Sequence, residues 1–169
     1  MTFSKLCAIC SKGCCTHVYP PITLERKRII DRYLQDQKIQ PRDWLNSTSR
    51  RYAFPRVTSD GACIFFDVVQ RTCRIHPVKP ETCRAGPVTF DLNTKEERVI
   101  WYLKSSADCL IAAELRRQPE VLSRYLSFAK KVLYQLICQL ESSALHELLL
   151  IDEPTVYYIG EDPFPLELL

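Results

Sequence analysis

Nine cysteines are the residues of this 169-residue chain that are best suited to chemistry. Four of them lie near the N-terminus in the run CAICSKGCC, and three more follow with nine residues between each and the next. A CxxC step lets two thiolates reach one metal site through a tight turn, and Gly13 supplies backbone freedom where the loop folds back. The sequence therefore predicts a metal centre made of thiolates.

Eight of the nine cysteines are candidate metal ligands. The ninth, Cys138, lies in an apolar helical stretch, where a thiol behaves as a small hydrophobic side chain. The side chains of adjacent Cys14 and Cys15 start from neighbouring Cα atoms and tend to diverge, so one of them is available for a second site or stays unbound. One cluster is favoured over two. The candidate ligands are Cys7, Cys10, Cys14, Cys15, Cys63, Cys73, Cys83 and Cys109.

The ligand type narrows the choice of metal. Thiolates suit zinc and iron-sulfur clusters, and they hardly suit calcium or magnesium. Structural zinc commonly takes two CxxC-like pairs, whereas the later cysteines here are nine residues apart. Irregular spacing fits the larger 4Fe-4S cluster better. We therefore expect an iron-sulfur cluster, 4Fe-4S in type and one or two in number, with zinc as the alternative.

Other side chains near the cysteines have weaker claims. His17 and His76 can ligate a metal or donate a hydrogen bond to a ligand, but ordinary packing beside the site is the favoured interpretation. His146 is expected to be an ordinary helix residue. The cation of Arg84, next to Cys83, can offset thiolate charge, although a surface salt bridge explains it equally well.

The composition favours one class of protein. An N-terminus without an apolar signal segment favours a reducing, cytoplasmic setting over a disulfide framework. No apolar run approaches the 18 residues of a membrane span. The net charge of +3 divides into about +8 for residues 1–150 and −5 for residues 151–169. Because the basic residues are not interleaved with a nucleic-acid motif, nucleic acid is not an expected partner.

The residue pattern predicts an α+β fold. It has a small cysteine-rich metal-binding core with short β-hairpins, then a helical C-terminal third and an extended tail. We expect one cysteine-cluster domain over residues 1–150 and an acidic tail over residues 151–169. The tail, rich in Pro and Tyr, is predicted to be an extended strap that either docks on a partner or covers the basic body of the chain.

Turn and cap signals locate the individual elements. Thr23 is the expected N-cap of a helix, Pro41 opens a short helix through Leu45, and Pro80 begins a turn of helix that carries Cys83. Ser105 or Ser106 caps another helix. Two hairpins, a long helix and a last short helix complete the prediction, at residues 62–69 with 72–75, 88–92 with 98–103, 119–140 and 144–150.

Several spaced motifs together resemble a known family. They are CxxCxxxCC from Cys7, TLE from Thr23, DGACIFFD from Asp60, CRIHP from Cys73 and KPETCR from Lys79. This ordered set is similar to the YkgJ-type cysteine-cluster family of zinc- or iron-chelating domains over about residues 7–110, with Cys109 matching a further downstream cysteine. The resemblance implies metal binding and includes iron-sulfur members.

Two positions depart from the family pattern. Ser11, Lys12 and Gly13 stand where two residues are usual before the paired cysteines, and Lys79 stands where Arg is usual before Pro80. The first departure alters the length of the first cysteine loop. Neither departure removes a thiol.

Enzyme motifs are missing from the sequence. It contains no GxGxxG, no P-loop, no HExxH and no CxxxCxxC, so an enzymatic role is left open but not favoured. We expect a small cytosolic iron-sulfur accessory protein, redox- or oxygen-responsive, that docks on a larger partner enzyme and supports or regulates it. The alternatives are an iron-sulfur oxidoreductase or electron carrier, a component of a protein-modifying enzyme, and a structural zinc-binding protein.

Overall fold

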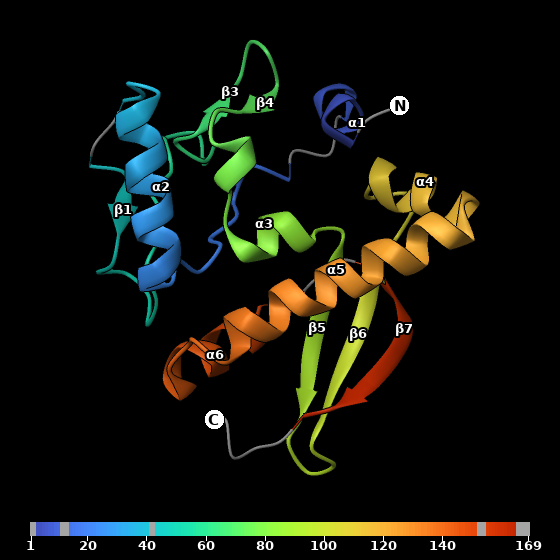
Figure 1. Cartoon of the computed structure of the whole chain (residues 1–169). Helices are drawn as coiled ribbons and strands as arrows, with labels where there is room; N and C mark the ends of the chain where they lie inside the picture. The colour runs from blue at the N-terminus through green and yellow to red at the C-terminus, as the bar shows by residue number, and fades with distance from the viewer. Residues whose placement is uncertain (1–2, 11–13, 41–42, 152–154, 165–169) are drawn as a thin grey trace. The chain divides into compact units, whose positions relative to one another are not determined.

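The chain forms two compact units in a computed structural model, Met1–Cys83 and Arg84–Leu169 (Figure 1). The structure describes residues 3–10, 14–40, 43–151 and 155–164. Helices and small antiparallel sheets make up both units, which confirms the predicted α+β class. Within the described residues, no helix combines the length and the apolar character that crossing a bilayer requires.

The first unit holds most of the cysteines on short elements. Its longest element is the 13-residue helix α2, and each of its strands is two residues long. The elements are α1 (Phe3–Ile9), α2 (Leu24–Asp36), β1 (Leu45–Asn46), β2 (Phe54–Pro55), β3 (Phe66–Asp67), β4 (Thr72–Cys73), the 3-10 turn η1 (His76–Val78) and α3 (Glu81–Ala85), whose last two residues belong to the second unit.

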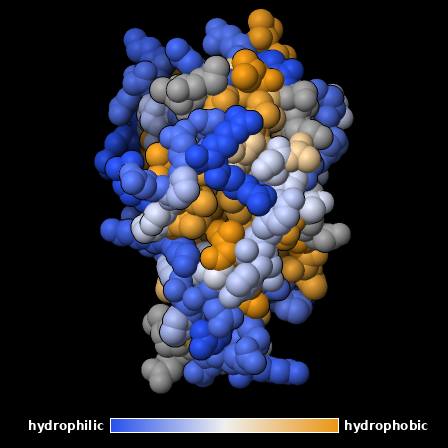
Figure 2. All heavy atoms as spheres, turned by 90° about the vertical axis from the view of Figure 1, so that its right-hand side faces the viewer, coloured by the Kyte–Doolittle hydropathy of each residue, from blue (hydrophilic) through white to orange (hydrophobic). Residues whose placement is uncertain are grey.

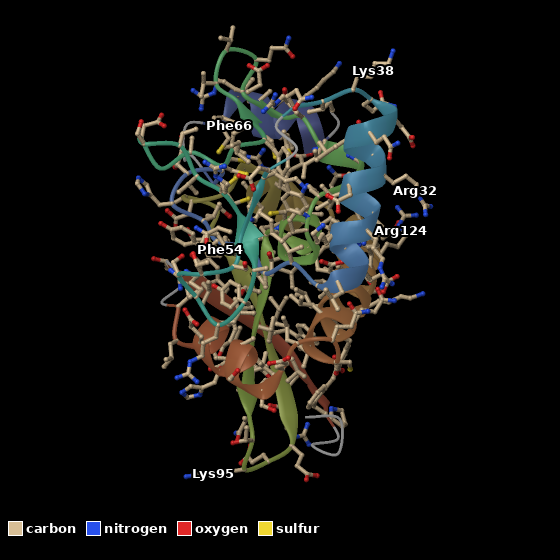
Figure 3. The ribbon with its side chains drawn as sticks, turned by 90° about the vertical axis from the view of Figure 1, so that its left-hand side faces the viewer. Arg32, Lys38, Phe54, Phe66, Lys95 and Arg124 are labelled. Atoms are coloured by element: carbon tan, nitrogen blue, oxygen red, sulfur yellow. The ribbon has the colours of Figure 1, made fainter. Side chains whose placement is uncertain are left out.

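Helix α2 begins where the sequence predicts. The side chain of Thr23 accepts a hydrogen bond from Arg26 N at 3.1 Å, which satisfies one of the amides that a helix start leaves unpaired. Ile30 and Leu34 then face a core that includes Trp44 and Phe65. Figure 3 shows Arg32 projecting outward from this helix and Lys38 just after its C-terminal end.

Two predicted elements of the first unit differ in the structure. The predicted helix from Pro41 to Leu45 is wrong: Asp43 and Trp44 have no regular structure, and Leu45 begins β1, while residues 41–42 lie outside the described part. Trp44 is buried, and its indole nitrogen donates a hydrogen bond of 2.8 Å to Oδ1 of Asp31, which fixes the position of the side chain. The hairpin predicted over residues 62–75 is present but shrinks to the pairs β3 and β4.

The second unit is a three-stranded antiparallel sheet with helices. Strands β5 (Val88–Asn93) and β6 (Arg98–Lys104) form the predicted hairpin, with Phe90 opposite Trp101. Every second residue of β6 is buried, as expected of a strand with one face on a core. The hairpin tip, at the lower end of Figure 2, is covered by hydrophilic side chains. The remaining elements are α4 (Leu110–Arg117), α5 (Pro119–Ile137), α6 (Ser142–Leu149) and β7 (Val156–Pro163).

Helix boundaries in this unit correct two predictions. The helix expected after Ser105 starts later, because Cys109 is the N-cap residue of α4. Ser105 instead accepts hydrogen bonds from the amides of Asp108 and Cys109, in the turn that leads into α4. Helix α5 ends at Ile137, so Cys138 is its C-cap and is exposed. The prediction of a buried, hydrophobic Cys138 is therefore wrong.

The acidic tail is part of this sheet. Residues 156–163 form β7, which pairs antiparallel with β6. Trp101 lies opposite Gly160 and Tyr102 opposite Tyr158, so Ile159 is the extra residue of a β-bulge. The expected strap is therefore a strand that packs on its own chain, and Phe164, which follows it, is only 2% exposed.

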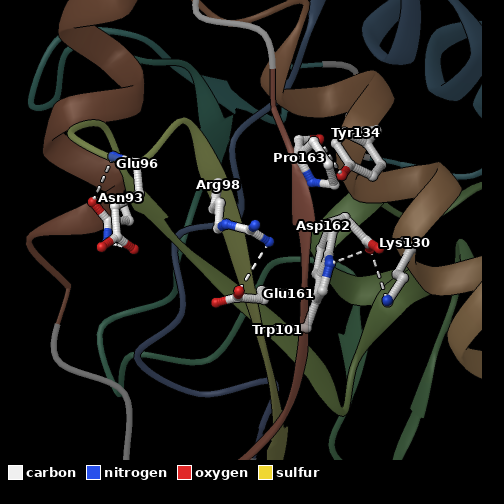
Figure 4. Close-up of polar contacts among 9 residues, drawn as sticks. All are labelled: Asn93, Glu96, Arg98, Trp101, Lys130, Tyr134, Glu161, Asp162 and Pro163. Carbon is white, nitrogen blue, oxygen red and sulfur yellow. Dashed lines mark hydrogen bonds and ion pairs between the residues drawn. The ribbon is translucent and has the colours of Figure 1, made fainter.

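Polar contacts fasten β7 to its neighbours (Figure 4). Asp162 Oδ2 accepts hydrogen bonds from Trp101 Nε1 and Lys130 Nζ, both at 2.7 Å. Arg98 and Glu161 form an ion pair at 2.9 Å on the same strands. Two acidic residues of the tail, Glu161 and Asp162, therefore make contacts within the second unit.

These contacts predict an acid-sensitive second unit. The hydrogen bond from Lys130, and then that from Trp101, lowers the pKa of Asp162 although burial opposes the shift. A lowered folded-state pKa stabilises the fold above the unfolded value of about 3.9, and this stabilisation is lost as the pH falls through the folded pKa. We expect the stability difference between the wild type and Asp162→Asn to shrink from about pH 5 downward in pH-dependent thermal melts. Asp91→Asn is the matched control, because this carboxylate on β5 accepts a hydrogen bond from the neighbouring amide of Leu92.

Candidate metal centre

Cys15 and Cys63 are brought together by backbone pairing between segments far apart in the sequence. Thr16 and Ala62 form an antiparallel bridge. On either side of it, Cys63 N donates to Cys15 O and His17 N donates to Gly61 O, both at 2.8 Å. The pairing thus places the end of the first cysteine cluster beside the first of the later cysteines.

Gly61 allows this close approach. Its φ is +81°, and a Cβ atom at this position would lie 2.3 Å from Cε1 of His17. The imidazole of His17 therefore lies directly over the glycine, and His17 itself has a positive φ of 54°. This ordinary packing role agrees with the favoured interpretation of His17, while ligation by it stays untested.

Two more cysteines come from the elements that follow. Cys73 ends β4 and pairs with Phe66 of β3, and Cys83 lies in α3. Phe66 N also donates to Cys63 O at 2.8 Å, which ties the hairpin to the first of the three cysteines. In Figure 3 yellow sulfur atoms gather below the labelled Phe66.

The thiols of these segments interact electrostatically. A hydrogen bond with Cys14, followed by burial, raises the pKa of Cys15, and the nearby thiols of Cys83 and Cys73 raise it further. Burial raises the pKa of Cys83 to about 12, and Cys63, Cys73 and Cys14 add to the rise. Five of the eight predicted ligands therefore form one group of mutually interacting thiols.

Two of these sulfur atoms also accept hydrogen bonds from the backbone. Burial raises the pKa of Cys63, while the amide of Phe65 acts in the opposite direction. Burial likewise raises the pKa of Cys73, and the amide of Ile75 opposes it. In both cases the donor is two residues after the cysteine, and such bonds stabilise the anionic sulfur that ligates a metal. The donor set therefore fits a thiophilic metal.

The CxxC pair lies on and after a helix. Cys7 is in α1 and Cys10 follows its end, with Cys10 N donating to Cys7 O at 3.2 Å. The guanidinium of Arg71, between β3 and β4, donates to Cys10 O. The expected loop is thus replaced by a helix at Cys7, and Gly13 lies outside the described residues.

The remaining cysteines belong to the second unit. Cys109 caps α4, so its place in the ligand set stays a prediction, and exposed Cys138 is the residue that was excluded from the set. Among the residues that the structure describes, no three Cys, His, Asp or Glu side chains are grouped tightly enough to hold a metal ion as they stand.

Cations near the thiols were missed by the sequence reasoning. The charge of Arg74 opposes the rise in the pKa of Cys63 and Cys73. The charge of Lys79 opposes the rise in the pKa of Cys73 and Cys83. Arg74 is held in place because it donates to Ile64 O at 2.6 Å and to Gln40 O at 3.1 Å. The position of Lys79 in the KPETCR motif was the available signal, whereas nothing local marked Arg74. His76 lies in η1, where partial burial, followed by the charge of Lys79, lowers its pKa.

Comparison with known proteins agrees with this site. A family model named CxxCxxCC, described as a putative zinc- or iron-chelating domain, matches residues 6–109, which is more than half of the chain. No curated protein and no solved structure matches the chain. The matched segment begins just before Cys7 and ends at Cys109, so it contains all eight predicted ligands. The chain belongs to the CxxCxxCC family of zinc- or iron-chelating domains, and this confirms the resemblance to YkgJ-type proteins.

Proposed function

We propose that this protein is a small cytoplasmic iron-sulfur accessory protein that responds to redox state or oxygen and docks on a larger partner enzyme. The observation that carries the proposal is the group of interacting thiols at Cys14, Cys15, Cys63, Cys73 and Cys83. Membership of a zinc- or iron-chelating family supports it.

The spacing and setting of the thiols favour iron-sulfur over zinc. Structural zinc commonly takes two CxxC-like pairs, whereas Cys63, Cys73 and Cys83 have nine residues between each and the next. Hydrogen bonds from Phe65 N and Ile75 N to the sulfur atoms are among the features that set the reduction potential of an iron-sulfur cluster. Zinc is the other outcome of the test described at the end of the Discussion.

The chain's own charges suit an anionic centre. Residues 1–83 contain 14 Lys and Arg against 7 Asp and Glu. Of these cations, Arg74 and Lys79 act directly on the thiols. A bound cluster supplies a redox-active group at the thiolates, and the protein stabilises the negative charge that accumulates on the sulfur atoms.

The same centre is coupled to the conformation of the first unit. Two-residue strands bury little surface, so their order depends on the contacts around the thiols. Because metal-binding energy is folding energy in such a site, loss of the cluster is expected to release the β3–β4 hairpin. This hairpin carries exposed Val68 and Val69, which can contact a protein partner.

The test of this role compares loaded and oxidised protein. Tagged protein is recovered from its native cells without oxygen, co-purifying proteins are identified, and each candidate is purified and titrated against the loaded and the air-bleached protein. We expect tight binding only to the loaded form, and weaker binding after Val68→Ser with Val69→Ser. Equal affinity of a purified partner for both forms would show that the cluster does not control docking.

A further inference from the structure

A buried ion pair joins the start of α2 to the start of α3. Arg26 Nε lies 2.6 Å from Glu81 Oε1, and the two side chains are 10% and 7% exposed. Arg26 has a fixed base, because it lies in the first turn of α2 and its amide donates to the capping side chain of Thr23. The guanidinium therefore reaches α3 from a rigid position.

This pair is a poor way to stabilise the unit. The cost of taking two charges out of water exceeds their attraction unless the remaining lone pairs are also satisfied. Glu81 Oε2 is buried and has no hydrogen-bond partner in the described part of the chain. Two apolar side chains of similar volume would serve the same contact equally well or better. The energetics therefore point to a role in geometry.

The geometry concerns Cys83, which follows Glu81 by two residues. Helix α3 spans only five residues, so it has little stability of its own and its rotation depends on its contacts. Successive residues of an α-helix are turned by about 100°, which places Cys83 about 200° around the helix from Glu81. Holding Glu81 against α2 therefore turns Cys83 to the opposite side, where it interacts with Cys63 and Cys73.

We infer that Arg26 and Glu81 form a positioning pair that sets the rotation of α3 and so delivers the Cys83 sulfur to the metal centre. The inference rests on the proposed function of the thiol group as a metal site. Arg26 and Glu81 are not ligands in this proposal, but they determine whether the Cys83 sulfur can reach the metal. Partners of this kind, which orient ligands, typically affect metal affinity by about 10- to 100-fold.

The test replaces the ion pair without removing the contact. The variant is Arg26→Met with Glu81→Leu, and the matched control is Arg56→Met with Asp43→Leu, an exposed ion pair of 2.8 Å in the same unit. The full-length proteins are titrated anaerobically with Co²⁺, whose thiolate charge-transfer absorbance grows with the number of bound sulfur atoms. Melting temperatures of the metal-free proteins are measured in parallel.

We expect the apolar pair to melt at the wild-type temperature or above and to bind Co²⁺ about 10- to 100-fold more weakly, with fewer thiolates. Adding the apolar pair to Cys83→Ser should cause no further loss of affinity, because both changes remove the same ligand. The control pair should bind like the wild type. If the apolar pair does not fold, Glu81→Asp, which keeps both charges but withdraws the carboxylate, should show the same loss of thiolates.

Two results separate the possible failures. Wild-type affinity and absorbance in the apolar pair, or a loss that adds fully to that of Cys83→Ser, would overturn the positioning role and leave the metal site intact. A wild-type protein that takes up no Co²⁺ at all would overturn the proposed metal site itself, and the positioning role with it.

Discussion

Replacing Cys63, Cys73 or Cys83 with serine is expected to remove the metal and to destabilise the first unit together. These thiols interact with one another. Cys63 lies just before the β3–β4 hairpin, Cys73 on the two-residue strand β4 and Cys83 on the five-residue helix α3. Cys10→Ser is expected to act in the same direction. The lost stabilisation is about 2.7 kcal/mol for a metal present at 100 times its Kd, and more at higher saturation. Metal content and thermal melting of each purified variant measure both effects.

Cys138→Ser is the matched control. Cys138 is exposed at the end of α5, so its replacement should change stability by no more than about 0.5 kcal/mol and leave the metal content unchanged. Full metal content and an unchanged melting temperature in all four variants of Cys10, Cys63, Cys73 and Cys83 would refute the ligand assignment.

Deleting residues 155–169 is expected to unfold the second unit. The deletion removes β7 and uncovers β6, including the indole of Trp101 that Asp162 holds. It also removes buried Phe164, which stacks on Tyr134 with ring centroids 6.1 Å apart. Loss of a buried Phe side chain alone costs about 3–5 kcal/mol, so the whole deletion costs more. Near-UV circular dichroism of the aromatic side chains and thermal melting measure the loss.

A shorter deletion tests the reason for this effect. Removing residues 165–169 leaves β7 and Phe164 in place and is the matched deletion, whereas Phe164→Ala in the full chain should lower the melting temperature. If the longer deletion keeps the wild-type melting temperature but loses binding to a partner, the tail is a docking strap after all.

The sequence predicts elements whose signals are local. Thr23 marks the start of α2 because a cap needs only the next three residues. Asn93 marks the β5–β6 hairpin because the turn and both strands are neighbours in the chain. Pro80 and Gly86 likewise bracket α3. The metal-binding motifs are also local, and the family match over residues 6–109 confirms them.

Elements that depend on distant partners are not predicted. Strand β7 pairs with residues about 60 positions earlier in the chain. Pro163 argues against a strand in the sequence, but proline is tolerated at the end of an edge strand, where its missing N–H costs little. Trp44 takes its place from Asp31 and the core, against the helix signal of Pro41. Cys138 lies just past the end of α5, where the apolar pattern continues but the helix does not.

The metal centre likewise combines features that the sequence predicts with features that depend on distant contacts. The cysteine types and spacings are visible in the sequence, but the gathering of Cys15 with Cys63 depends on the bridge between Thr16 and Ala62. The contribution of Arg74 depends on two backbone carbonyls from separate segments, at Gln40 and Ile64. Such contacts leave no periodic trace in the sequence.

The most direct measurement of the central claim is the iron, acid-labile sulfide and zinc content of protein purified from its native cells without oxygen. The account predicts brown protein with iron and sulfide in near-equal amounts, little zinc, and visible absorbance that bleaches in air as the cluster is oxidised. Stoichiometric zinc with neither iron nor sulfide would contradict it.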